Sequence, residues 1–449
     1  MAGASSSLQR TLHSTTQKEI KTHIKPKVTI PFRRQGTLHS SPRVQPGSTM
    51  TSVATFQPLF PEDRVLDGSI ERAATLIDKA RRLLKADDTP LAAALVPQLR
   101  SMNSYYTNKI EGQHTTPGKI EAALRRDYSP DADEYRKQRM AIAHIAAESE
   151  LESEWREVSV QALFDPGRVR DIHARFFSAM PLELLVTPDG DPTIPGALRD
   201  KDVTVGRHEA PEVAMIEPLM AEWGARYRLI RPREFQLIAI ACSHHRLAWI
   251  HPFIDGNGRV CRLHSHLALH AAGLTQGLWS PLRGFARSHE TYYSRLAEAD
   301  MTRRNDLDGR GNLSQEALIR FVDYFLDCCL DQVDFMLKMV DFDGVSMRLK
   351  DLLLYLEAHP WQIGSEKSII KPEKTATLLE FIALRRALPR ADFVRMLGES
   401  ENTGRRIIRS LLDFGILKSA THRDDLAFAL PLKSLRFVFP RLWPEVDIE

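Results

Sequence analysis

Apolar residues recur at helical spacing along most of this chain. Between 67 and about 154, and again between 234 and 342, they return every three or four positions, which predicts helices with a buried face. Pro117 is typical of a first helical turn, and Gly273 is typical of a helix end. The fold class is therefore expected to be mainly α. The predicted helices in this part are 71–86, 91–110, one from Pro117, 168–179, 234–250, 257–272, 288–300 and 314–342.

The helical pattern is interrupted between Pro181 and Pro211. Proline and glycine are frequent there, and Asp202–Gly206 alternates between polar and apolar residues like a short strand. This segment predicts a small β-hairpin. The helical pattern weakens a second time between 345 and 368, where we expect a boundary between domains.

The last stretch of the chain has an order of its own. Helices are predicted at 375–384, from Pro389 onward and at 401–414, and two short apolar segments, 416–418 and 426–430, flank a turn. Three helices followed by a small hairpin are typical of a winged helix-turn-helix domain.

These patterns divide the chain into five expected parts. They are a basic tail at 1–52, an N-terminal helical region at 53–165, a core domain at 166–345, a linker at 346–371 and the winged-helix domain at 372–449. The tail has two interpretations. It is either disordered, including the case of a translated stretch upstream of a start near Met50, or a presequence of the basic, acid-poor kind. We favour the first, because no clear amphipathic helix occurs in it.

Charge is distributed unevenly along the chain. The net charge of +3 includes eight basic residues and one acidic residue, Glu19, within 1–52, which leaves 53 of the 61 basic and 57 of the 58 acidic side chains for the rest. The body is therefore not a strongly basic nucleic-acid binder. There is no apolar run long enough to span a membrane, and the four cysteines lack paired spacing, so a reducing cytoplasm is the expected location.

The densest group of chemically capable residues is His251-Pro-Phe-Ile-Asp-Gly-Asn-Gly-Arg259, followed by Arg262. His251 is a candidate base near neutral pH, and Asp255 is a hard oxygen donor that suits Mg²⁺. Gly256 and Gly258 leave backbone amides open to phosphate oxygens.

The helix predicted after the glycines adds to this chemistry. Its N-terminus favours anions, and Arg259 and Arg262 lie three positions apart on one face, where guanidinium groups can bind phosphate oxygens in pairs. Taken singly, each of these residues is more often structural. Together they predict a site for phosphoryl chemistry on a nucleotide.

The same string resembles the H-x-F-x-D/E-G-N-G-R-x-x-R signature of Fic-domain proteins at each position. Most proteins of that family resemble protein adenylyltransferases, which move AMP from ATP to a hydroxyl side chain. The resemblance implies that His251 is the catalytic base and that Asp255 holds Mg²⁺. It further implies that Asn257, Gly258 and Arg259 hold the α- and β-phosphates, and that Arg262 holds the γ-phosphate.

The resemblance extends over about 90–330. The predicted hairpin near 196–208 lies where the family carries a flap that aligns the target segment by strand addition. Tyr292, Tyr293 and Asp300 fall where the family contacts adenine and ribose. The family often has asparagine where this chain has Asp300.

A second motif, Thr107-Asn-Lys-Ile-Glu111-Gly112, resembles the inhibitory motif S/T-x-x-x-E-G/N of the same family. A Glu111 carboxylate that reaches Arg262 would occupy the place of the γ-phosphate. The resemblance therefore implies autoinhibition by Glu111. The same glutamate has a second use in some relatives, where it positions a water that removes AMP.

The sequence thus predicts a Mg²⁺-dependent, ATP-using protein adenylyltransferase that acts on Ser, Thr or Tyr of a target protein or of itself. One alternative is a DNA-binding regulator with a nucleotide-sensing Fic core. Another is a Fic enzyme that uses a different donor or removes AMP. The basic residues Arg405, Arg406 and Arg409 on the predicted helix 401–414 make DNA a candidate partner. A homodimer is a further candidate, and no membrane partner is expected.

Overall fold

The computed structural model describes residues 52–84, 89–206, 208–340, 344–364 and 366–448. The predicted tail at 1–52 lies outside the described residues except for Ser52. Within the described ranges, no helix is both long enough and apolar enough to cross a lipid bilayer.

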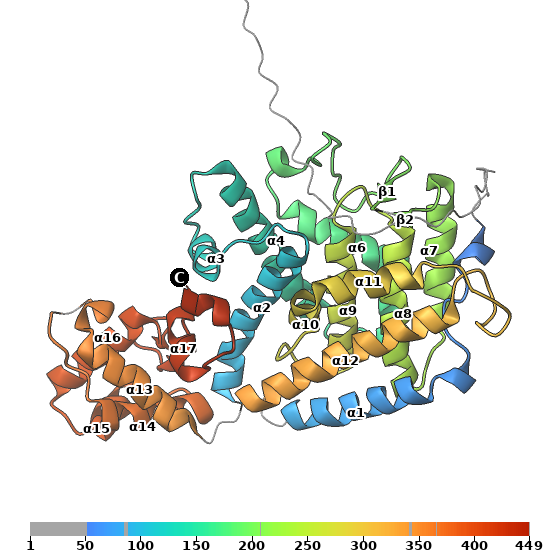
Figure 1. The fold of residues 1–449 in the computed structure, drawn as a ribbon. Coiled ribbons are helices and arrows are strands. Elements are labelled where there is room, and N and C mark those ends of the chain that lie inside the picture. The colour runs from blue at the N-terminus through green and yellow to red at the C-terminus, as the bar shows by residue number, and fades with distance from the viewer. Residues whose placement is uncertain (1–51, 85–88, 207, 341–343, 365, 449) are drawn as a thin grey trace, which may run out of the picture. The chain divides into compact units, whose positions relative to one another are not determined.

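The described chain is mainly helical, as the sequence predicts (Figure 1). The first twelve α-helices are α1 (Asp67–Leu84), α2 (Pro90–Ile110), α3 (Pro117–Leu124), α4 (Ala132–Glu154), α5 (Val160–Leu163), α6 (Pro166–Ser178), α7 (Val213–Tyr227), α8 (Arg233–Ile250), α9 (Asn257–Ala271), α10 (Leu282–Arg287), α11 (His289–Ala299) and α12 (Gln315–Met339).

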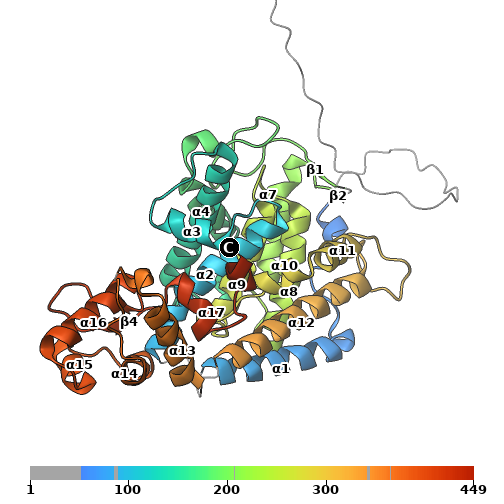
Figure 2. The same ribbon diagram turned by 60° about the vertical axis from the view of Figure 1, so that its left-hand side comes forward.

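Two long helices from distant parts of the sequence, α1 and α12, run side by side (Figures 1 and 2). Apolar residues such as Leu76 and Phe325 are fully buried. Ion pairs line the contact, with Lys79 2.7 Å from Asp334. Burial of apolar side chains is the main source of stability here, and surface pairs of this kind add little.

Helices α8 and α9 form the centre of the domain. Both are buried over nearly their whole length, α8 from Leu237 to Leu247 and α9 from Asn257 to Leu269. The short loop between them, 251–256, carries half of the predicted motif. Because both flanking helices are fixed in the core, the loop is held at two ends by packed structure.

The predicted hairpin is present and short. Strand β1 (Thr204–Val205) pairs antiparallel with β2 (His208–Glu209). Helix α7 follows it and was not predicted, because Pro218 lies inside the helix and interrupts the sequence pattern.

The C-terminal region contains α13 (Val345–Ala358), α14 (Pro372–Leu384), α15 (Arg390–Leu397), α16 (Glu401–Phe414), β3 (Leu417–Lys418), β4 (Ala427–Phe428) and α17 (Leu435–Val438). Strands β3 and β4 pair antiparallel. The elements follow the predicted order, and the assignment as a winged helix-turn-helix remains a prediction.

The expectation that the helical pattern weakens after 345 was wrong. Helix α13 covers Val345–Ala358 and packs against α14. Its buried leucines, at 349, 352, 353 and 356, have the spacing of one helix face. The proline at 360 begins a 3₁₀ helix (Pro360–Ile363) directly after this helix, and the glycine at 364 ends that second helix, so much of the expected linker is packed structure.

Candidate active site

The loop between α8 and α9 begins at His251, which ends α8 in the left-handed conformation with φ of 52°. This conformation turns the chain out of the helix. Arg199, from the segment before the hairpin, donates from Nε to the His251 carbonyl oxygen at 2.8 Å. The buried Arg199 side chain also donates to the carbonyl oxygens of Lys201 and Pro211. One arginine therefore joins the motif loop to both sides of the β-hairpin.

Asn257 holds the loop in shape from the other end. Its Nδ2 donates to the Phe253 carbonyl oxygen at 2.8 Å, and its Oδ1 accepts from the Phe253 backbone N–H at 2.9 Å. The side chain that the resemblance assigns to phosphate binding is thus engaged with the loop backbone. From this position, Asn257 presents the backbone at the start of α9 to a ligand.

Helix α6 supplies the floor beneath the loop. The His173 ring stacks on Phe253 with ring centroids 4.0 Å apart. Because the Gly196 N–H donates to His173 Nδ1 at 2.8 Å, Nε2 carries the proton and donates to the Asp255 carbonyl oxygen at 3.3 Å. Burial lowers the pKa of His173 to about 4, which agrees with a neutral ring.

Gly256 is required by this packing. Its φ is +80°, and a Cβ at this position would come within 2.5 Å of Phe177 on α6. We expect Gly256→Ala to destabilise the fold by about 2–5 kcal/mol, since a left-handed alanine costs about 1–2 kcal/mol and an overpacked contact about 1–3 kcal/mol. Thermal or denaturant unfolding measures this change.

Gly190→Ala is the matched control for that prediction. Gly190 also has a positive φ, +90°, but a Cβ there meets no atom within 4 Å. The free energy of unfolding of Gly190→Ala is expected to fall only by the cost of a left-handed alanine backbone, about 1–2 kcal/mol. Equal losses in the two variants would show that the contact with Phe177 does not constrain the loop.

Two buried arginines point from α9 toward α2. The Arg259 Nε donates to Asn108 Oδ1 at 3.0 Å, and its NH2 group donates to Gln113 Oε1 at 2.6 Å. Arg262 is 1 % exposed, and its Nε donates to Thr107 Oγ1 at 2.9 Å. Both guanidinium groups are therefore held by polar side chains of the segment that the sequence singles out as an inhibitory motif.

Glu111, at the end of α2, completes this contact. Its Oε1 lies 2.5 Å from the Arg262 NH2 group. Although burial alone would raise it, the charges of Arg262 and Arg259 hold the pKa of Glu111 below its ordinary value. The carboxylate also lies directly over Gly258, where any side chain would overlap with it. A carboxylate thus occupies the position at the start of α9 that favours an anion.

The C-terminal segment contacts the same helix. Glu445 accepts from the Tyr106 hydroxyl at 2.9 Å and lies 3.4 Å from the Lys109 ammonium group. Gln98, further up α2, donates to the Leu430 carbonyl oxygen at 2.7 Å. The helix that carries Glu111 is therefore packed between the core helices and the C-terminal region.

The electrostatic environment of His251 suits a base. Burial, together with the charges of the neighbouring His208 and Arg199, lowers its pKa to about 4. A lowered pKa means that the ring stays neutral, and able to accept a proton, at every pH well above 4. His208 itself donates from Nε2 to the Trp249 carbonyl oxygen at 2.8 Å, which ties β2 to the end of α8.

This shift predicts the pH dependence of any reaction that uses His251 as a base. Loss of rate on the acid side is expected as the pH falls through about 4, because only there does the ring of the folded protein take up a proton. An ordinary histidine would lose its rate near pH 6.5. The pH profile of kcat/KM checks this, and an acid limb near 6.5 would contradict the burial argument.

Asp255, the predicted Mg²⁺ ligand, is partly exposed in the loop. Its Oδ1 accepts from the Gly256 N–H at 2.6 Å, which fixes the carboxylate beside the start of α9. A fixed, partly exposed carboxylate next to an anion-binding backbone fits a hard cation shared with phosphates. The donor set is therefore compatible with Mg²⁺.

The two tyrosines of α11 differ in their placement. Tyr292 is fully buried, and its hydroxyl lies 2.8 Å from His244 Nε2 inside the core. The structure therefore packs Tyr292 in the core, and its contact with a nucleotide remains a prediction. Tyr293 is 45 % exposed, and its hydroxyl donates to the Ile110 carbonyl oxygen at 3.3 Å, next to Glu111.

Asp300 connects α11 to the hairpin. Its carboxylate lies 3.1 Å from His245 Nε2 and 3.5 Å from His208 Nδ1. In this position the Asp300 carboxylate supports β2 through His208, and it is less accessible to a ribose.

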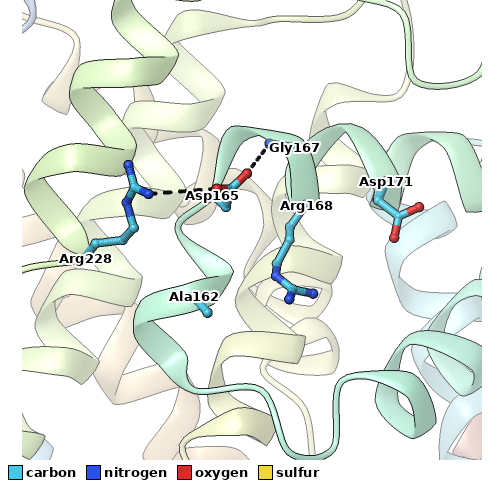
Figure 3. A pocket seen from close by; sticks show the side chains of 6 residues that line it. All are labelled: Ala162, Asp165, Gly167, Arg168, Asp171 and Arg228. Carbon is cyan, nitrogen blue, oxygen red and sulfur yellow. Dashed lines mark hydrogen bonds and ion pairs between the residues drawn. The ribbon is translucent and has the colours of Figure 1, made fainter.

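A separate surface hollow of about 540 Å³ lies at the start of α6 (Figure 3). It is lined by Ala162, Asp165, Gly167, Arg168, Asp171 and Arg228, and none of these belongs to the motif. Asp165 accepts from the Gly167 N–H at 2.7 Å and so caps α6 itself. The candidate active site is therefore the motif loop with the start of α9, and this hollow is no part of it.

Comparison with known families agrees with this location. Residues 163–269 match the model of the Fic/DOC family. This chain contains a Fic/DOC family domain. The matched range spans α6, the hairpin, α7, α8, the motif loop and most of α9. Glu111, Tyr292 and Tyr293 lie outside it.

Several solved structures of Fic proteins are similar to the chain. A Fic family protein from Desulfovibrio desulfuricans G20 shares 16% identity with a TM-score of 0.47, over 80% of this chain and 96% of that one. A Fic domain containing signaling protein from Bacteroides thetaiotaomicron shares 17% identity with a TM-score of 0.43, over 60% of this chain and 96% of that one. Fic-1 from C. elegans shares 18% identity with a TM-score of 0.44, over 60% of this chain and 72% of that one.

Several residues around the Fic domain's motif were not found from the sequence. Arg199, His173, Asn108 and Gln113 each reach the motif from a distant segment. Asn108 lies inside the Thr107–Gly112 motif without being one of its defining positions, and the other three belong to no local pattern.

Proposed function

We propose that this chain is a protein adenylyltransferase that transfers AMP from ATP to a hydroxyl side chain and is inhibited by its own Glu111. Proteins of the Fic/DOC family commonly carry out AMPylation or other nucleotidyl transfer to proteins. The observation that carries the proposal is the convergence of a neutral His251 with the buried Arg259 and Arg262 at the start of α9, where the Glu111 carboxylate lies.

The reaction follows from these groups. His251 takes the proton of the target hydroxyl, and the hydroxyl oxygen forms a bond to the α-phosphorus of ATP. The bond from that phosphorus to the bridging oxygen breaks, and pyrophosphate leaves with the electron pair. Arg259 and Arg262 stabilise the negative charge that builds on the phosphates. Mg²⁺ held by Asp255 would neutralise part of the same charge.

The hairpin is the proposed site for the target protein. Val205 on β1 is exposed, and Arg199 ties the segment before the hairpin to the carbonyl group of His251. A target segment that pairs with β1 or β2 would therefore lie close to the base.

Inhibition follows from the contact between Glu111 and Arg262. The γ-phosphate of ATP and the Glu111 carboxylate both need the Arg262 guanidinium, and they repel each other. ATP therefore binds either weakly or in an unproductive position while α2 holds its place. The Glu111–Arg262 pair is also compatible with the opposite reaction, in which AMP is removed from the target protein.

The test is label transfer with two forms of ATP. The full chain carrying Glu111→Gly is incubated with Mg²⁺, a cell lysate and ATP labelled at the α- or the γ-phosphate. Label from the α-position alone, with a mass increase of one adenylyl group on Ser, Thr or Tyr, supports the proposal. Label from the γ-position would instead indicate phosphoryl transfer. No label from either form of ATP, with label instead from UTP labelled at the α-phosphate or from CDP-choline labelled in its choline group, would indicate another donor.

DNA binding through the C-terminal region receives less support. On α16, Arg405 pairs with Glu401 and Arg409 lies 3.8 Å from Asp413. These arginines are partly neutralised by acids of their own helix. A salt-dependent mobility shift of DNA by this chain would be needed to support DNA binding.

A further inference from the structure

A second group of charged side chains lies buried between α4 and α9, away from the motif loop. Glu148 and Glu152 project from one helix and His266 from the other, and their ligand atoms all lie within 4.8 Å of one another. All three side chains are at most 3 % exposed. The cluster is separate from Asp255, the predicted Mg²⁺ ligand.

The longer of two distances in the cluster matches that between ligands of one metal ion, and the shorter is a hydrogen bond that a shared ion would lengthen. His266 Nε2 lies 2.8 Å from Glu152 Oε1 and 3.7 Å from Glu148 Oε1. Ligands bound at about 2.0–2.2 Å from a common ion are themselves about 3–4 Å apart. The two glutamates are spaced by one helical turn, so both reach the same point without any change in backbone.

The charges in the cluster call for a cation. Glu152 is paired with Arg100, whose NH2 group lies 2.6 Å from Oε2. Glu148 receives a hydrogen bond from the neutral amide of Asn103 at 2.9 Å and lies 3.1 Å from His144 Nε2. A buried carboxylate without a charged partner costs several kcal/mol. Either a proton on a histidine or a metal ion has to balance it.

Neighbouring side chains orient the donors toward one point. Ser280 Oγ lies 3.0 Å from His266 Nδ1, which directs Nε2 at the carboxylates. His144 is fully buried, and its Nδ1 has no hydrogen-bond partner among the described residues, so its polar contact is made toward Glu148. Such outer partners are what orient ligands at metal sites. His270 Nδ1 lies 3.7 Å from Glu152 and extends the cluster on the α9 side.

We propose that Glu148, Glu152 and His266 bind one divalent transition-metal ion, Zn²⁺ in the first place, as a structural site that joins α4 to α9. Two carboxylate oxygens with one imidazole nitrogen suit Zn²⁺ better than Ca²⁺ or Mg²⁺, which take oxygen ligands. Helix α4 packs against α2, and α9 carries Arg259 and Arg262. The ion would fix the helices that hold both sides of the candidate active site. The proposal does not depend on the reaction catalysed there.

The test uses Zn²⁺ and Co²⁺ as probes. The untagged full chain is unfolded, freed of metal with a chelator, and refolded with either ion. One equivalent of ion that survives dialysis is expected, with visible absorption from Co²⁺. Glu148→Gln is expected to lower the affinity for the ion at least about tenfold, which is a loss of about 1.4 kcal/mol or more in binding. Glu150→Gln, on the exposed face of α4, is the control that keeps it.

Metal retention below about a tenth of an equivalent would overturn the proposal, and a proton on His266 would then balance the cluster. Unfolding of the wild-type chain provides a second measurement that needs no variant. Its midpoint is expected to rise when Zn²⁺ is present during refolding. Identical midpoints with Zn²⁺ and with chelator would also count against a metal site.

Discussion

Replacing Glu111 by glycine is expected to raise the rate of AMP transfer by about 10- to 100-fold. The carboxylate lies 2.5 Å from Arg262 and covers the start of α9. A hydrogen bond to a charged group contributes about 1.5–3 kcal/mol, and in the variant this interaction becomes available to the γ-phosphate of ATP. The initial rate of incorporation of α-labelled AMP into protein measures the change.

Two controls separate inhibition from a general loosening of the fold. Glu366→Gly makes the same substitution at an exposed position remote in sequence from both motifs, and its rate should equal that of wild type. Glu111→Gln keeps the size of the side chain and removes its charge, so its rate should fall between wild type and Glu111→Gly. Equal rates for wild type and Glu111→Gly would contradict autoinhibition by this residue.

Replacing His251 by asparagine in the activated chain is expected to lower the transfer rate by roughly 10²- to 10⁴-fold, the range that a general base contributes. Asparagine is chosen because His251 has φ of 52°, a conformation that asparagine adopts more easily than alanine. The contact from Arg199 goes to the backbone of residue 251 and remains possible in the variant. The loop is therefore expected to keep its shape while losing its base.

Binding of ATP distinguishes loss of the base from loss of the site. The affinity of the variant for ATP should change little, since Arg259, Arg262 and the start of α9 remain in place. His289→Asn, at an exposed position that begins α11, should leave both rate and affinity unchanged. If the variant at 251 kept its rate of AMP transfer, the base would be a group other than His251.

Much of the fold could be predicted because its signals are local. The start of α9 after Gly256 and the end of α16 at Gly415 were both set by single glycines with positive φ. Helix α7 was missed because Pro218 breaks the pattern without breaking the helix. Helix α13 lies where the sequence pattern is expected to weaken, although its buried leucines have helical spacing.

The candidate site also has one part that the sequence predicts and another part that it does not. The residues from His251 to Arg262 form one continuous segment, so their proximity follows from the sequence alone. The contact between Glu111 and Arg262 joins positions 151 residues apart and was expected only through resemblance to a family. Glu148 and His266 meet through the packing of two distant helices, and Arg199 reaches His251 from the loop before the hairpin. A single sequence has no local pattern for either contact.

The most direct test of the account compares four chains for transfer of α-labelled AMP in Mg²⁺: wild type, Glu111→Gly, His251→Asn and the double variant. Strong labelling by Glu111→Gly, weak labelling by wild type and near-background labelling by the two chains with His251→Asn is the predicted result. Labelling by the double variant at the level of Glu111→Gly, or no labelling by any chain, would contradict the proposed adenylyl transfer through His251.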